Sequence, residues 1–212
     1  MKIAVFHHGV LSSPLANLGD EAVVLFAEQM EALKQSGLSK AATEIHLGMN
    51  SSDMLLASAM APDKATVHST GDGSQGEKPT LKILEQWLPG HEGWFVCYHH
   101  MKGCCSGGKH ESRRCMEEAV IWNWRQCIHD LQSGFDAVGC HWLDWRVNAV
   151  CKGQRYFGGT FWWTTHKFLS ELPPLNDNVN NGRYYEGEIW IGRHAGEIRV
   201  RDYHRNGRMC CL

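Results

Sequence analysis

The chain has 212 residues, a length that favours one domain with a substantial core over two independent domains. Its 21 lysines and arginines against 23 aspartates and glutamates give a formal net charge of −2, which supplies no global electrostatic reason to expect a nucleic acid or a membrane surface as partner. No apolar stretch approaches the length of a membrane span, and the N-terminal run MKIAVFHHGV has no basic region or cleavage-like sequence, so we expect a cytoplasmic protein with residues 1–212 in a single domain.

Predicted strands and helices alternate along the first two thirds of the chain. Residues 2–8 have the apolar pattern of a strand, and after Asp20 apolar residues recur at spacings of three and four up to Gly37, which predicts a helix that ends there. The alternation continues with strands predicted at 43–50, 65–70, 93–100 and 136–142 and helices predicted at 51–61, 79–88 and 112–134. This pattern predicts an α/β fold with a Rossmann-like, mostly parallel central sheet flanked by helices, and such sheets bind ligands at the carboxyl ends of their strands.

The nine cysteines of the chain are an odd number, and three of them fall in sequence typical of a strand or helix interior. A disulfide framework would pair an even number at loop positions. We therefore expect reduced thiols, in keeping with a cytoplasmic compartment.

The run YHHMKGCCSGGKH, residues 98–110, follows the fourth predicted strand and allows three interpretations. A zinc site would draw on His99, His100, Cys104, Cys105, His110 and Cys115. However, zinc ligands usually come in pairs two to four residues apart, whereas adjacent side chains on an extended chain diverge. An anion site would use backbone amides of the glycine-bearing loop with Lys102 and Arg113 or Arg114, although both common phosphate-loop fingerprints are missing. The third interpretation is an ordinary surface loop.

The run YFGGTFWWTTHKFLSELP, residues 156–173, combines glycines with three successive aromatic residues before a predicted amphipathic helix. Gly158 and Gly159 permit a positive φ or a close backbone approach. Since neighbours on a strand face opposite sides, at least one of Trp162 and Trp163 should lie in the core, which leaves the other to line a pocket. The flat face of an aromatic ring suits the C–H face of a sugar.

Several runs together resemble a family of small glycosyltransferase-like proteins found among bacterial polysaccharide genes and viruses. The likeness covers roughly residues 2–193, in order, and includes the segments 28–38 and 77–81. The matching residues are Tyr98, His100, Lys102 and Gly103; Trp124 and Arg125; Asp136, Val138 and Gly139; Phe157, Gly158, Gly159, Phe161, Trp162 and Trp163; Leu172 and Pro173; and Arg183, Tyr184, Glu188, Trp190, Ile191 and Gly192.

The resemblance implies a GT-A-like fold and an enzyme that moves a sugar from a nucleotide-diphosphate sugar to a hydroxyl acceptor. Glu188, or Glu186 two positions earlier, is then the candidate base, and two carboxylates on one side of a strand would raise the pKa of one of them. The residues expected to bind the sugar donor are His7, His8, His99, His100, Lys102, Gly103 and Arg113. Those expected to bind the sugar or acceptor are Gly158, Gly159, Thr160, Phe161, Trp162 and Trp163, and the family has Asn where Thr160 stands, which puts specificity in doubt.

Metal-dependent GT-A enzymes carry a DxD motif after a central strand, and this chain contains none. We therefore expect no required cofactor, with Lys102, assisted by His99, His100 and Arg113 or Arg114, neutralising the leaving diphosphate; Mn²⁺ or Mg²⁺ stays an alternative.

The acceptor is open between a saccharide and, because the family has viral members, a hydroxylated base in DNA, in which case the compartment is the host cytoplasm. The segment 193–208 carries five arginines and is either a phosphate-binding patch or a solvated hairpin. Two other classes remain: a sugar-binding module without catalysis and a zinc-dependent interaction protein.

Overall fold

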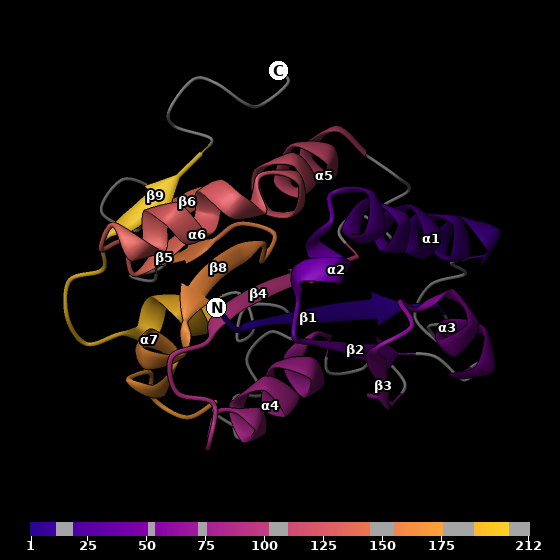
Figure 1. Ribbon diagram of the computed structural model, residues 1–212, viewed down its shortest axis with the longest axis horizontal. Helices are drawn as coiled ribbons and strands as arrows, with labels where there is room; N and C mark the ends of the chain where they lie inside the picture. Colours follow the sequence, from indigo (N-terminus) through magenta and orange to yellow (C-terminus); the bar gives the residue numbers. More distant parts are fainter. Residues whose placement is uncertain are drawn as a thin grey trace.

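A computed structural model describes residues 1–11, 19–50, 54–71, 76–101, 110–144, 155–175 and 189–203. Seven of its strands form one sheet in the order β3–β2–β1–β4–β8–β5–β9 (Figure 1). They are β1 Ile3–Val10, β2 Glu44–Asn50, β3 Ala65–Ser69, β4 Phe95–His100, β5 Ala137–Gly139, β8 Trp162–Thr165 and β9 Val200–Asp202. Strands β6 Trp142–Asp144 and β7 Arg155–Phe157 form a separate antiparallel pair.

The sheet is mostly parallel, as the alternating pattern predicted. Strands β3, β2, β1 and β4 pair in parallel, whereas β8 pairs antiparallel with β4 on one side and with β5 on the other. Strand β5 therefore has the direction of β4, and β9 pairs with it in parallel. As a result, the carboxyl ends of β1, β4 and β5 lie at one edge of the sheet together with the amino end of β8.

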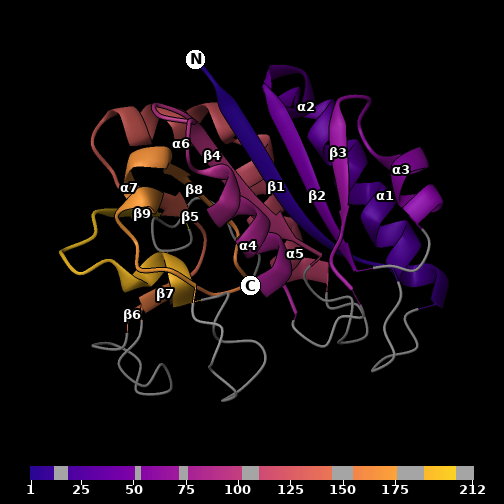
Figure 2. The ribbon, with the colours of Figure 1, turned by 90° about the horizontal axis from the view of Figure 1, so that it is seen from below.

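Helices cover both faces of the sheet (Figures 1 and 2). They are α1 Gly19–Gln35, α2 Leu38–Ala41, α3 Met54–Met60, α4 Lys78–Trp87, α5 His110–Glu117, α6 Trp124–Gln132 and α7 His166–Ser170, with the π-helix η1 Glu118–Trp122 and the 3₁₀-helix η3 Trp190–Arg193. In β1, Ile3 and Val5 point into a core with α1, η1 and α6, while Ala4 and Phe6 point into a second core with α4 and α7. This alternation follows from the two-residue period of a strand.

The helix predicted over 112–134 is interrupted by η1, which the periodicity did not indicate. Two side chains bond to carbonyls of this segment: Trp163 Nε1 donates to Val120 O at 2.7 Å, and Cys127 Sγ to Ala119 O at 3.2 Å. Side-chain bonds of this kind compensate for the irregular helical hydrogen bonds of a π-bulge.

The last residues of the run 184–190, expected to continue a strand, instead enter a helix at Ile189 and Trp190. The backbone of Gly192 lies so close to that of Arg155 that a methyl group there would collide with the Arg155 carbonyl. A 3₁₀ turn brings η3 this close to β7, which an extended chain beside the sheet would not do.

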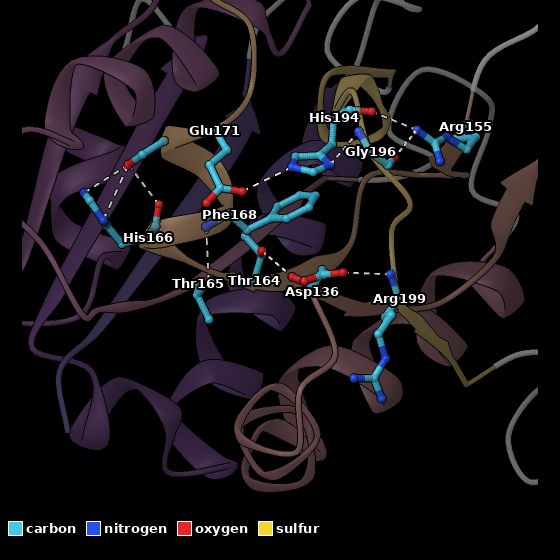
Figure 3. A network of polar contacts seen from close by, with 11 residues as sticks. Asp136, Arg155, Thr164, Thr165, His166, Phe168, Glu171, His194, Gly196 and Arg199 are labelled. Carbon is cyan, nitrogen blue, oxygen red and sulfur yellow. Dashed lines mark hydrogen bonds and ion pairs between the residues drawn. The ribbon is translucent and has the colours of Figure 1, made fainter.

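The segment after η3 is fixed by polar contacts around His194 (Figure 3). Arg155 Nη2 donates to the carbonyls of His194 and Gly196, and the backbone N–H of Gly196 donates to His194 Nδ1. Because Nδ1 accepts this bond, Nε2 carries the ring proton and donates to Glu171 Oε2 at 3.2 Å. These bonds fix η3 against α7 and β7.

Candidate functional site

Residues from three distant segments meet at the side chain of Glu77, which is buried at the end of the sheet where β1 and β4 finish. Tyr98 OH donates to Glu77 Oε2 at 3.0 Å, and Thr160 Oγ1 donates to Glu77 Oε1 at 2.9 Å. His100 Nδ1 lies 3.4 Å from Glu77 Oε2. We call Glu77, Tyr98, His100 and Thr160 the Glu77 cluster.

The sequence around Glu77 explains why a carboxylate sits here. Glu77 occupies the N-cap position of α4, with a proline in the first helical turn, and its carbonyl accepts from the N–H groups of Thr80 and Leu81. The positive end of the helix favours a negative side chain at this position. Helix α4 therefore places the carboxylate against the last residues of β4.

Thr160 reaches Glu77 from a tight turn made by the two glycines. The N–H of Thr160 donates to Phe157 O at 3.0 Å, and Gly159 has a φ of 93°, as the third residue of a type II turn requires. Thr160 itself has a φ of 55°, a conformation that costs free energy for a β-branched residue. The turn confirms that the glycine pair supplies a positive φ.

His8 lies beside the cluster, on the same face. Its Nδ1 is 2.8 Å from Thr80 Oγ1, and Thr80 fills the space above Gly48, where a methyl group would collide with it. Burial lowers the pKa of His8 to about 4, so the ring is neutral at pH 7. His8 therefore brings a hydrogen-bonding group to this edge, and no charge.

His7 and His99 point to the opposite face and pair with each other. Their Nδ1 atoms are 3.1 Å apart, so one ring donates and the other accepts, and both side chains are fully buried. Burial lowers the pKa of His99 to about 3 and that of His7 well below its usual value, which His99 nearby lowers further. The expectation that His99 helps to neutralise a diphosphate is corrected: the ring is uncharged and enclosed in the core.

Arg113 is buried beneath α1, where carboxylates surround it. Its Nη2 lies 2.7 Å from Glu28 Oε2 and its Nη1 3.3 Å from Glu117 Oε1. Gln29 Nε2 donates to Glu117 Oε1 and to the carbonyl of His100. The guanidinium, 1% exposed, thus supports the end of β4 from within the core, and its expected direct contact with the sugar donor is corrected.

The aromatic run 161–163 lies in the core. Trp162 stacks on Tyr98 with ring centroids 5.2 Å apart, while Trp163 faces the other side of the sheet and bonds to Val120 O. Both indoles and Phe161 are at most 1% exposed. The predicted role of these rings as a sugar-stacking surface is therefore corrected, because opposite faces of a sheet covered on both sides are equally buried.

Four of the predicted site residues, Lys102, Gly103, Glu186 and Glu188, lie outside the described residues. Within the described ranges, no group of three or more histidine, cysteine, aspartate or glutamate side chains is arranged to hold a metal ion. The described thiols of Cys97, Cys115, Cys127 and Cys140 are free and buried, which confirms the expectation of reduced cysteines for these four.

The arginines of the predicted basic patch that are described lie at the β9 edge. Arg201 Nε is 3.3 Å from Asp130 Oδ2, and the guanidinium groups of Arg199 and Arg201 each lie 5.5 Å from the ring of Phe135. One of the two charges is thus partly balanced within the protein.

Sequence reasoning missed Glu77 and Thr80 as site residues. The segment 77–81 matched the family pattern, but its helix-starting proline explained it equally well as local structure. The signal that would have found Glu77 is a carboxylate at a helix N-terminus one strand before a motif rich in histidine.

No family model and no curated protein matches this chain. Among solved structures, Rv0371c from Mycobacterium tuberculosis H37Rv aligns with 96% of this chain and 88% of that chain, with a TM-score of 0.48 and 13% identity. The 4-diphosphocytidyl-2C-methyl-D-erythritol synthase of Anaerococcus prevotii DSM 20548 aligns over the same shares, with a TM-score of 0.46 and 11% identity. Likeness at this level does not identify a substrate. In the described part of the chain, no helix combines the length and the apolar character needed to cross a bilayer.

Proposed function

We propose that this protein is a nucleotide-sugar-dependent glycosyltransferase that moves a sugar from a nucleotide diphosphate to an acceptor hydroxyl. The observation that carries the proposal is the meeting of separate motif segments at one carboxylate. Tyr98 and His100 come from one motif, Thr160 from another, and all three surround Glu77. Residues that fit one family pattern thus converge at the sheet edge where α/β proteins bind their ligands.

The sugar donor would lie with its diphosphate against the end of β4. Since His7, His8 and His99 are neutral, positive charge for the leaving group must come from elsewhere, and Lys102 is the residue that the resemblance implies. Glu77 holds the ring of His100 at the strand end, because a carboxylate beside Nδ1 favours a proton on that nitrogen.

In the transfer step, the acceptor oxygen forms a bond to the anomeric carbon while the bond from that carbon to the phosphate oxygen breaks. The hydroxyl proton passes to a carboxylate, for which Glu188 or Glu186 is the candidate. The packing of Ile189, which follows Glu188, supports this assignment. Ile189 lies with Tyr156 and Leu143 in one apolar group, and Leu143 is the side chain nearest to Gly158 of the glycine turn.

We further propose that the transfer needs no divalent ion, since the chain contains no DxD motif. The acceptor is proposed to be a saccharide, with a hydroxylated DNA base as the rival that the arginines of β9 keep open. If DNA is the acceptor, replacing Arg199 and Arg201 should weaken DNA binding and flatten its salt dependence.

The test is a melting-temperature screen against nucleoside diphosphates and the matching nucleotide sugars, with EDTA or with Mn²⁺ and Mg²⁺. A ligand that binds only the folded protein raises the melting temperature by mass action, so a base-selective rise in EDTA is expected. Release of nucleoside diphosphate from the same nucleotide sugars then measures turnover.

The alternatives give different results. A sugar-binding module binds free sugars but neither binds nor releases nucleoside diphosphates. A zinc-dependent interaction protein contains stoichiometric zinc by elemental analysis. A rise that appears only with Mn²⁺ or Mg²⁺ would overturn the metal-independent mechanism but leave the glycosyltransferase.

A further inference from the structure

Among the described residues, only two that are not glycine have a positive φ, and they are neighbours in space. His141 has a φ of 63° and Thr160 a φ of 55°. They are joined through the glycine turn, because the N–H of Gly158 donates to His141 O at 2.8 Å. Such conformations cost free energy for residues other than glycine and persist only where surrounding contacts impose them; they cluster at functional sites.

Contacts of this kind hold His141 in place. The carboxylate of Asp202, on β9, accepts from the N–H of His141 at 3.0 Å and from the N–H of Trp142 at 3.1 Å. Asp202 is itself buried. The bend separates β5 from β6 and aims the backbone at 141 away from the sheet, although a continuous strand was predicted over 136–142.

The location of His141 relates it to the Glu77 cluster. It follows the carboxyl end of β5, and β8 alone separates β5 from β4. Two strand spacings amount to roughly 10 Å. With a diphosphate at the end of β4, this position lies on the side of the glycine turn, where the sugar would be. His141 is half-buried, and its Cβ would be 3.7 Å from a methyl group placed on Gly158.

We propose that His141 is a specificity-determining residue that hydrogen-bonds hydroxyl groups of the transferred sugar. This inference rests on the proposed function. An imidazole suits hydroxyl groups because one ring nitrogen donates while the other accepts. The strain at 141 then serves to keep the ring at the turn rather than in the plane of the sheet.

The test compares the wild type with His141→Gly, using the nucleoside diphosphate and the nucleotide sugar that give the largest melting-temperature rise in the screen. Glycine adopts positive φ without strain, so the unliganded variant should melt at the wild-type temperature or up to about 4 °C higher. Affinity by titration calorimetry should fall about tenfold or more for the nucleotide sugar and stay within about twofold for the nucleoside diphosphate.

Two further variants serve as controls. His141→Asn keeps a hydrogen-bonding side chain that tolerates positive φ, and should recover part of the lost affinity. His129→Ala removes a histidine whose side chain is 70% exposed on α6 and should change neither affinity.

The outcomes separate the two proposals. A wild type that binds no nucleotide ligand overturns both. A wild type that binds the nucleotide sugar, with a His141→Gly variant that binds it equally well or loses both ligands alike, overturns the role of His141 and leaves the glycosyltransferase. Should the glycine variant not fold, the same comparison is decided with His141→Asn against His141→Ala.

Discussion

The hydroxyl of Thr160 donates to the carboxylate of Glu77 at 2.9 Å, across 83 positions of sequence. This bond connects the N-terminus of α4 to the turn that leads into β8. Both partners are buried, so the bond is exchanged with water only when the site opens. It ties a helix on one face of the sheet to the strand that completes the sheet.

Replacing Glu77 with Gln should weaken both the fold and the reaction. The amide presents N–H groups where Tyr98 and Thr160 now donate, so a buried donor loses its acceptor, at a cost of about 1–3 kcal/mol in the free energy of unfolding. Release of nucleoside diphosphate should fall at least tenfold. Urea unfolding and turnover measure the two effects, with Tyr98→Phe as the control that removes one bond only. A Gln variant with wild-type turnover contradicts the role of this cluster.

Thr160 should respond differently to Asn and to Val. Asn tolerates a positive φ and can still donate to Glu77, so Thr160→Asn should keep or slightly raise the free energy of unfolding. Thr160→Val keeps the strain and loses the hydroxyl, which should cost about 1–3 kcal/mol. Chemical denaturation of the pair decides it, and equal stability of the two variants would refute the geometry described here.

The two adjacent tryptophans should differ in what their indole nitrogens contribute. Trp163→Phe removes the bond to Val120 O in the π-helix, whereas Trp162 Nε1 has no hydrogen-bond partner within the described residues. Trp163→Phe should therefore destabilise the fold by about 1 kcal/mol more than Trp162→Phe. Neither change should alter sugar affinity selectively. A sugar-specific loss of affinity in either variant would restore the stacking interpretation.

Stability should fall with pH because of the buried histidines. The folded pKa of His8, about 4, lies below its unfolded value near 6.5, so the unfolded chain binds more protons between these limits. The contribution is complete above pH 6.5 and is lost as the pH falls toward 4, reaching roughly 2 kcal/mol at pH 5. The free energy of unfolding of His8→Gln should depend less steeply on pH from 6.5 to 5 than that of the wild type. Parallel slopes would contradict the assignment.

Arg113 should prove to be structural. Replacing it with Met leaves the carboxylates of Glu117 and Glu28 without their partner in a buried setting, which should cost about 3–5 kcal/mol. At a temperature where the variant is folded, its affinity for nucleoside diphosphates should stay within about twofold of the wild type. A much larger loss of affinity than of stability would return Arg113 to the sugar-donor site.

The order of strands and helices could be predicted from the sequence because each element has its own periodicity. The alternation of apolar residues in 93–100 and the glycine pair at 158 and 159 are local signals, and both were interpreted correctly. The burial of Trp162 and Trp163 was half right, since a strand pattern does not tell whether one or both faces of its sheet are covered.

What the sequence did not reveal depends on contacts between distant segments. Glu77 looks like an ordinary helix start until Thr160 and Tyr98 are brought beside it. The positive φ of His141 has no local signal, because histidine is not a turn residue and Asp202 is 61 positions away. The histidines at 7 and 99 looked like ligands because sequence shows neither their burial nor their mutual pairing.

Strand β8 has a consequence for how the protein is made. Among the described strands, it alone joins the half-sheet built on β1 and β4 to the half built on β5 and β9. During synthesis, the two halves share no strand pairing until Thr165 has emerged from the ribosome. A nascent chain stopped short of that residue would expose a bare edge on β4, a template for pairing with a second chain.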